Sequence, residues 1–161
     1  MSSGITTATM SSYAILGCGS VGHAVAEELE REGKDVLILD RDESRVEALR
    51  DQDLNAETAD IRDESIVEKL TDRDVVLILS SDVSANEVAV ETLRTHDDDQ
   101  FIVARASDPV SADDLSELGA NVVINPSAVI ANSALRALET GELEHKARQL
   151  AAVIDATDER M

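Results

Sequence analysis

Three closely spaced glycines near the N-terminus could hold a phosphate group. They are Gly17, Gly19 and Gly22, and they lie between an apolar run and a stretch with helical periodicity. The first glycine would permit a tight turn, the second would let the backbone approach a pyrophosphate, and the third would let the helix pack against the strand. Free N–H groups at the start of that helix would bind phosphate oxygens. The pattern therefore predicts a dinucleotide site at residues 17–22.

An acidic residue at the end of the second apolar run fits the same site. Asp40 follows Gly22 by 18 residues, close to the spacing of about 20 in dinucleotide-binding folds. Its carboxylate would accept hydrogen bonds from the adenosine ribose, and its charge would repel a 2′-phosphate, which favours NAD over NADP. Arg41, the next residue, could weaken this preference. The alternative is a related fold whose site is empty or has another use.

The elements that would position these residues alternate along the chain. Apolar runs predict six strands, at 13–17, 35–40, 54–58, 74–80, 100–105 and 121–125. Helical patterns follow them at 21–33, 41–50, 64–70, 83–94, 110–118 and 126–139, the third with Asp63 as its N-cap. Strands alternating with helices form right-handed βαβ units and a parallel sheet covered on both faces. We therefore predict an α/β fold, Rossmann-like and doubly wound, with six parallel strands and helices on both faces.

The sequence divides into three parts. Residues 1–12 are rich in Ser and Thr and predict a disordered leader, 13–139 predict the Rossmann nucleotide-binding domain, and 140–161 predict an amphipathic helix or linker. The apolar face of this last segment would pack either on its own domain or on a second subunit. Because the chain stops without a closing element, we expect a further domain to follow it.

The composition is strongly acidic, with a formal net charge of −20. Such a chain repels nucleic acid and anionic lipid, which makes both poor partners. Acid excess and scarce lysine predict a halophile's cytoplasm, where concentrated salt screens the repulsion. The alternative is an acidic block that binds a basic partner, but the acidic residues are spread over the whole chain.

Few residues in the sequence could hold a metal or enter redox chemistry. Cys18 is the single cysteine, so no internal disulfide forms, and three scattered histidines have no zinc-ligand spacing. Cys18 lies in the glycine-rich stretch and could sense oxidation, although such a cysteine is more often just a small residue that fits there. No apolar run is long enough for a membrane helix, and the N-terminus does not look like a signal peptide.

Long stretches of the chain resemble one known family. They are "YAILGCGSVGHAVAEELEREGKDVLILDRDESRVEALRDQ", "AETADIRDESIVEKL", "DVVLILSSDVSANEVAVETLR" and "LGANVVINPS". Across residues 13 to about 138 the chain resembles the TrkA-N family, also called the RCK N-terminal or KTN domain. That family binds nucleotides, mostly NAD(H) and sometimes ATP or AMP, and regulates potassium channels and transporters. The resemblance therefore implies a nucleotide ligand and a cytoplasmic regulatory role.

The resemblance also implies which residues contact the nucleotide. Asp60 and Ile61 would lie by the adenine, Ser80 and Ser81 over the cofactor at the end of the fourth strand, and Arg105 on the fifth strand. Arg105 could instead pair with a neighbouring acid, and Asn86, which matches an asparagine of the family, could simply pack in its helix. The complete set of expected cofactor-binding residues is Gly17, Cys18, Gly19, Ser20, Val21, Gly22, Asp40, Arg41, Asp60, Ile61, Ser80, Ser81 and Arg105.

The chain departs from the family pattern in two places. The third strand is followed by Ala59-Asp60-Ile61 where the family usually has Gly-Asp-Ala, and no RCK C-terminal domain follows. Residues 125–161 instead resemble the linker in proteins that fuse a TrkA-N domain to a DHH-type phosphoesterase. The controlled partner is therefore either a membrane potassium transporter or channel, or a fused phosphoesterase.

Three functions fit this sequence. The first is a nucleotide-sensing regulatory domain, expected to form a homodimer and to have no catalytic residue of its own. The second is a fragment of an NAD-dependent oxidoreductase, but Tyr13, the single tyrosine, starts the first strand and belongs to no Tyr-x-x-x-Lys pair. The third is an oligomerisation scaffold with a structural nucleotide. A tightly bound nucleotide that never exchanges would distinguish the scaffold from the nucleotide sensor.

Overall fold

The computed structural model describes residues 12–140 and 145–152. The predicted leader lies outside the described residues except for Ser12, which is the first residue of a strand and pairs with Asp35. The predicted C-terminal segment is described at Thr140, which ends a helix that begins at Pro126, and over residues 145–152, which form a helix.

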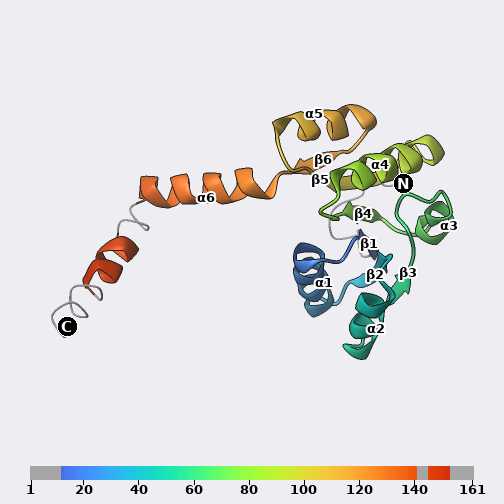
Figure 1. Cartoon of the computed structure of the whole chain (residues 1–161), viewed down its shortest axis with the longest axis horizontal. Coiled ribbons are helices and arrows are strands. Elements are labelled where there is room, and N and C mark those ends of the chain that lie inside the picture. Colours follow the sequence, from blue (N-terminus) through green and yellow to red (C-terminus); the bar gives the residue numbers. More distant parts are fainter. Residues whose placement is uncertain (1–11, 141–144, 153–161) are drawn as a thin grey trace, which may run out of the picture. The chain divides into compact units, whose positions relative to one another are not determined.

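Six parallel strands form one sheet (Figure 1). Their bounds are β1 Ser12–Leu16, β2 Asp35–Asp40, β3 Ala56–Thr58, β4 Val75–Ile78, β5 Phe101–Arg105 and β6 Val122–Ile124. The strand order is β3-β2-β1-β4-β5-β6, so the chain starts in the middle, runs to one edge, returns beside β1 and then runs to the other edge. This is the order of the doubly wound Rossmann fold, and the predicted fold class is confirmed.

Six helices follow the strands in turn. Their bounds are α1 Ser20–Arg31, α2 Glu43–Asp51, α3 Ile66–Leu70, α4 Val83–His96, α5 Pro109–Leu118 and α6 Pro126–Thr140. The third is shorter than predicted: Ser65 is its N-cap, and the Asp63 carboxylate instead accepts a hydrogen bond from the Ser65 N–H within the preceding turn.

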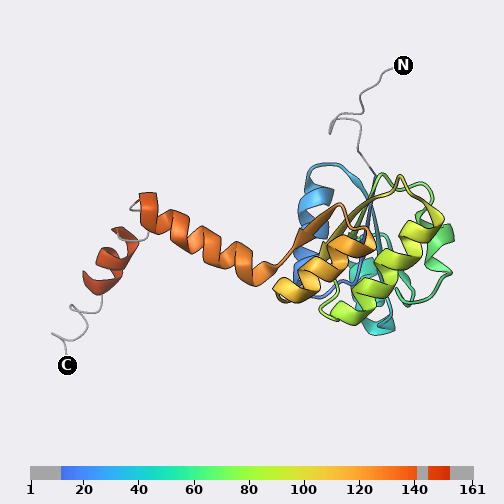
Figure 2. The same ribbon diagram turned by 90° about the horizontal axis from the view of Figure 1, so that it is seen from above.

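Two apolar layers lie on opposite faces of the sheet. Ile15 packs with residues of α1 and α2, whereas its neighbours Ala14 and Leu16 pack with residues of α3, α4 and α5. This alternation follows from the strand geometry, in which successive side chains point to opposite faces. Helices α4 and α5 lie side by side over the second face (Figures 1 and 2). The two layers hold the ends of the strands in fixed positions, and the candidate site lies at these ends.

The chain divides into two compact units. The first ends at Asn125, after β6, and the second begins at Pro126 with α6. Within residues 12–140 and 145–152, no helix combines the length and the apolar character needed to cross a bilayer.

Candidate functional site

A cavity of about 410 Å³ opens at the carboxyl ends of the strands. Its walls come from the loops after β1, β2, β3 and β4, from the first turns of α1, α2 and α4, and from the last residues of β2 and β5. The cavity spans the point where the strand order reverses between β1 and β4, which is where open α/β sheets bind their ligands. Eleven expected site residues line it: Gly17, Cys18, Gly19, Ser20, Asp40, Arg41, Asp60, Ile61, Ser80, Ser81 and Arg105.

The glycine loop is built by close backbone approach. Gly17 has φ +87°, and a Cβ placed there would lie 2.7 Å from the backbone N of Ser80. A Cβ at Gly22 would collide with the carbonyl oxygen of Gly17. Two expected site residues, Val21 and Gly22, do not line the cavity. Gly22 is buried beneath the loop, and Val21 packs against the apolar layer around Ile15. At Gly19 a Cβ would meet no described atom within 4 Å, so the space above it is open.

Helix α1 begins at this loop without a side-chain cap. Its N-cap is Gly19, and its first turn carries no acidic residue. The neighbouring long helices differ, because aspartate side chains at Asp42, Asp82 and Asp108 accept hydrogen bonds from the first N–H groups of α2, α4 and α5. The first N–H groups of α1 are therefore available to an anion, and the helix dipole favours negative charge there.

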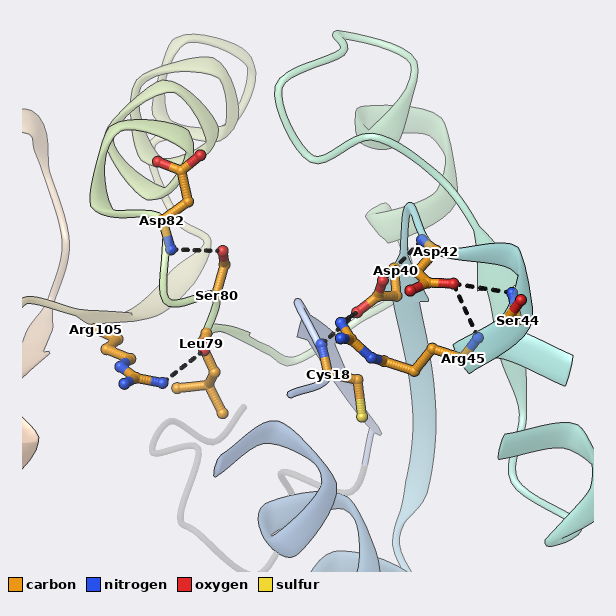
Figure 3. Close-up of polar contacts among 9 residues, drawn as sticks. All are labelled: Cys18, Asp40, Asp42, Ser44, Arg45, Leu79, Ser80, Asp82 and Arg105. Atoms are coloured by element: carbon orange, nitrogen blue, oxygen red, sulfur yellow. Dashed lines mark hydrogen bonds and ion pairs between the residues drawn. The ribbon is translucent and has the colours of Figure 1, made fainter. Parts of the chain in front are cut away.

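Asp40 is held by three donors at the end of β2. Its side chain is 4% exposed. One oxygen, Oδ2, accepts the N–H of Cys18 at 2.7 Å and the guanidinium Nη1 of Arg45 at 3.0 Å, and Oδ1 accepts the N–H of Asp42 at 2.9 Å (Figure 3). Burial alone would raise the pKa of Asp40, but the two backbone N–H groups and Arg45 outweigh it and hold the pKa below the usual value.

Cys18 is buried and chemically quiet. Burial raises the pKa of its thiol to about 11, and the nearby charge of Asp40 adds to the effect against the opposing charge of Arg45. Because the thiolate is the reactive form, such a cysteine is a poor redox sensor. Of its two interpretations from sequence, the structure therefore favours the small residue that fits.

The loop after β3 contributes an exposed ion pair. Asp60 accepts hydrogen bonds from the backbone N–H of Arg62 at 2.9 Å and from its guanidinium Nε at 3.2 Å. The Arg62 N–H and guanidinium lower the pKa of Asp60, and the charge of Arg41 contributes in the same direction. Ile61 is buried and belongs to the apolar layer under α4.

The opposite wall of the cavity is formed by the ends of β4 and β5 (Figure 3). The Ser80 hydroxyl accepts the N–H of Asp82 at 3.0 Å, and Arg105 donates to the carbonyl of Leu79 at 3.4 Å. Asn86 lies behind the cavity wall, fully buried, and its Nδ2 donates to the carbonyl oxygens of Ser80 and Arg105 at 2.8 and 3.0 Å. It therefore ties the two strand ends together, while its Oδ1 has no partner among the described residues.

The charges around the cavity balance, in contrast to the rest of the chain. Four arginines and four aspartates line it, Arg41, Arg45, Arg62, Arg105, Asp40, Asp42, Asp60 and Asp82, although the chain carries a net charge of −20. Guanidinium groups are the donors that bind phosphate in a bidentate way. An anionic ligand is therefore less strongly repelled here than at the remaining surface. In the described part of the chain, no group of acids, histidines or cysteines is arranged to hold a metal ion.

Sequence reasoning missed several lining residues, which are Asp42, Arg45, Ala59, Arg62, Leu79, Asp82 and Ala85. Arg45 and Arg62 matter most among them, because each forms an ion pair with an expected site residue. A signal for both was present in the sequence: each arginine follows an expected acidic site residue by a few positions.

Comparison with known proteins identifies a family model and a curated relative that are similar to this chain. The family model described as "TrkA-N domain" matches residues 13–126. The Ktr system potassium uptake protein C of Bacillus subtilis (strain 168) is 24% identical over 155 residues, which are 87% of this chain and 68% of that protein.

Two solved structures share the fold. The NAD(P)-binding domain of an exopolyphosphatase-related protein from Archaeoglobus fulgidus is 28% identical, with a TM-score of 0.74, over 80% of this chain and 98% of that one. GsuK bound to ADP is 26% identical, with a TM-score of 0.68, over 86% of this chain and 35% of that one. The family model covers more than half of the chain and includes the glycine loop, Asp40 and the ends of all six strands. The chain therefore belongs to the TrkA-N domain family.

Proposed function

We propose that this domain binds an adenine nucleotide, NAD(H) first among them, and passes a ligand-dependent change of shape to a partner. One observation carries the proposal: the uncapped start of α1 and the buried carboxylate of Asp40 face the same cavity. Phosphates would bind the free N–H groups of α1, and the adenosine ribose would bind near Asp40. A cavity of about 410 Å³ is of the size that holds small ligands.

The composition of the cavity wall supports binding rather than turnover. Hydride transfer needs a general acid or base beside the nicotinamide. The wall, as far as the structure describes it, contains no histidine, tyrosine or lysine. The alternative of an NAD-dependent oxidoreductase fragment would have to use Cys18 or an aspartate of the wall as its acid or base, although Cys18 is buried and Asp40 is held by three donors. A sensor needs only a difference in affinity between two conformations.

Two effectors are supported by the relatives. The name of the Ktr potassium uptake protein favours control of potassium transport as the first candidate. The exopolyphosphatase-related relative favours a fused phosphoesterase as the second, because this chain covers 98% of its NAD(P)-binding domain. ATP, ADP or AMP stay alternatives to NAD(H), since GsuK also has a structure with ADP.

We further propose that the domain acts as a homodimer through α6. Large apolar side chains are exposed on this helix, at Val129, Ile130, Leu135 and Leu138. Its two charged residues, Arg136 and Glu139, have opposite signs, whereas the chain as a whole carries −20. Two copies would therefore meet at α6 with little of the repulsion that opposes contact elsewhere. Light scattering should show a dimer for the unmodified protein and a monomer for Ile130→Asp. The control is Val110→Asp on α5, where Val110 is as exposed as Ile130, and this variant should remain a dimer.

Isothermal titration tests nucleotide binding directly. NADH, NAD, ATP and AMP would be titrated into the purified protein in roughly molar salt, where the repulsion is screened. We expect micromolar NAD(H) binding. Preference for ATP or AMP would be consistent with a nucleotide sensor but would exclude NAD(H) as its ligand. If no nucleotide binds, the proposal is overturned.

Two glycine variants separate binding from folding. Gly19→Ala places a methyl group in open space on a backbone with φ −76°. It should therefore lower stability by no more than about 1 kcal/mol, because alanine is a poorer N-cap for α1 than glycine. It should weaken nucleotide binding at least about tenfold, because the phosphates need that space. Gly33→Ala, which lies outside the cavity at φ +78°, should instead lower stability without changing affinity.

A further inference from the structure

We propose that Arg45 is a specificity-determining residue that reads the 2′ position of the bound ribose. It would pair with Asp40 when the site is empty and with a 2′-phosphate when the nucleotide carries one. This inference rests on the proposed nucleotide binding and adds to it the class of nucleotide that the site accepts.

The first argument is the number of acceptor positions left on Asp40. A carboxylate offers about four lone-pair positions, and three are already filled by the N–H groups of Cys18 and Asp42 and by Arg45. A ribose with free 2′- and 3′-hydroxyls has two donors for one remaining position. Full recognition of that ribose therefore requires one of the three donors to leave.

Arg45 is the donor that can leave. The N–H groups of Cys18 and Asp42 belong to the backbone of the glycine loop and of the α2 N-cap, which are fixed by their own helices. The Arg45 side chain is 46% exposed and reaches Asp40 through a single hydrogen bond of 3.0 Å. Because Asp40 is only 4% exposed, the guanidinium can leave at low cost only when the ribose hydroxyls replace it as donors to the carboxylate.

The second argument is what the released guanidinium would meet. Arg41 and Arg62 line the same cavity as Arg45, and arginines beside the ribose acid are the groups that accommodate a 2′-phosphate in dinucleotide-binding folds. The charge of Asp40 would repel this phosphate, and the guanidinium of Arg45, which lies beside Asp40, would offset that repulsion from a position between the two anions. The sequence-based preference for NAD over NADP therefore does not follow from Asp40 alone.

Removal of Arg45 should act on two affinities in opposite directions. A ribose with free hydroxyls no longer competes with the guanidinium for Asp40, so its affinity should rise or stay the same. A 2′-phosphorylated ribose loses its partner and meets an uncompensated carboxylate, so its affinity should fall. The ratio of the two dissociation constants is therefore the sensitive quantity.

The test compares two pairs of probes that differ by the 2′-phosphate. They are AMP against adenosine 2′,5′-bisphosphate, and NADH against NADPH, titrated into the unmodified protein, Arg45→Gln, Arg45→Lys and Arg31→Gln. Arg31 is the control because it pairs with Glu28 on the exposed surface of α1, outside the cavity. In Arg45→Gln the ratio Kd(2′-phosphorylated)/Kd(unphosphorylated) should rise about tenfold or more, and in Arg45→Lys it should rise less. Arg31→Gln should leave it within about twofold, because charges beyond a Debye length are screened.

Each other outcome has a defined meaning. A ratio in Arg45→Gln that stays within about twofold of the unmodified protein, or that falls, overturns the inference. So does an unmodified protein that binds AMP but has no measurable affinity for the bisphosphate. Failure of every probe to bind instead overturns the proposed function itself. Thermal unfolding of each variant shows whether it is folded. If Arg45→Gln does not fold, Arg45→Lys, which keeps the charge beside Asp40, is the variant on which the ratio is tested.

Discussion

Substitution of Gly17 by alanine should lower the stability of the domain through two separate effects. The first is conformational, since φ is +87° and an L-residue in the left-handed region costs about 1–2 kcal/mol. The second is steric, since the new Cβ would lie 2.7 Å from N, Cα and Cβ of Ser80. Two of these atoms are backbone and cannot rotate away, so the loop or the end of β4 must shift, which costs about 1–3 kcal/mol.

Gly33→Ala is the matched control for this prediction. Its φ of +78° resembles that of Gly17, but a Cβ there would meet no described atom within 4 Å. It should therefore show the conformational cost alone. Alanine also restricts the unfolded chain by a similar amount in both variants, and this contribution cancels when the two are compared. The difference between them should be about 1–3 kcal/mol, which is the steric cost.

Urea unfolding in roughly molar KCl, followed by far-UV circular dichroism, measures both free energies of unfolding. We expect both variants to unfold at lower urea than the unmodified protein, Gly17→Ala lowest. If Gly17→Ala were no less stable than Gly33→Ala, the close approach of the glycine loop to β4 would not be a constraint on the fold, and the reasoning would be refuted.

Three further predictions concern stability. Arg94→Ala should cost about 2 kcal/mol by urea unfolding, because this guanidinium donates to the carbonyls of Asp97, Asp98 and Gly119; a cost under about 0.5 kcal/mol would contradict this bridging role. Because the folded pKa of Asp40 is lowered, its ionised form stabilises the fold above about pH 4, and this contribution is lost as pH falls through the folded pKa. Asp40→Asn should accordingly show a flatter decline of stability below about pH 4 than the unmodified protein, and parallel declines would speak against it. Finally, raising KCl from about 0.1 to about 1 M should raise the thermal midpoint, because the Debye length falls from about 10 to about 3 Å, and a constant midpoint would argue against the halophilic interpretation of the charge.

The strands and the glycine loop could be predicted because their signals are local. A buried parallel strand such as 35–40 is a continuous apolar run, and the loop from Gly17 to Gly22 has a spacing that few other structures require. The start of α3 was predicted less well. Asp63 has the chemistry of an N-cap, yet its carboxylate closes a turn before the helix, and both uses of an aspartate look the same in sequence.

Residue types and their spacing determined the fold class, the glycine loop and the acidic residue at the end of β2, because backbone conformation and burial are encoded over short stretches of chain. Tertiary structure alone decided how the ends of the strands meet. It placed Ser80 close to Gly17, and it directed the Asn86 amide to donate to the backbone carbonyls at two strand ends. It also brought the Arg45 guanidinium within hydrogen-bond distance of Asp40. Side-chain direction depends on what packs around each group, and that is set by contacts between residues far apart in the chain.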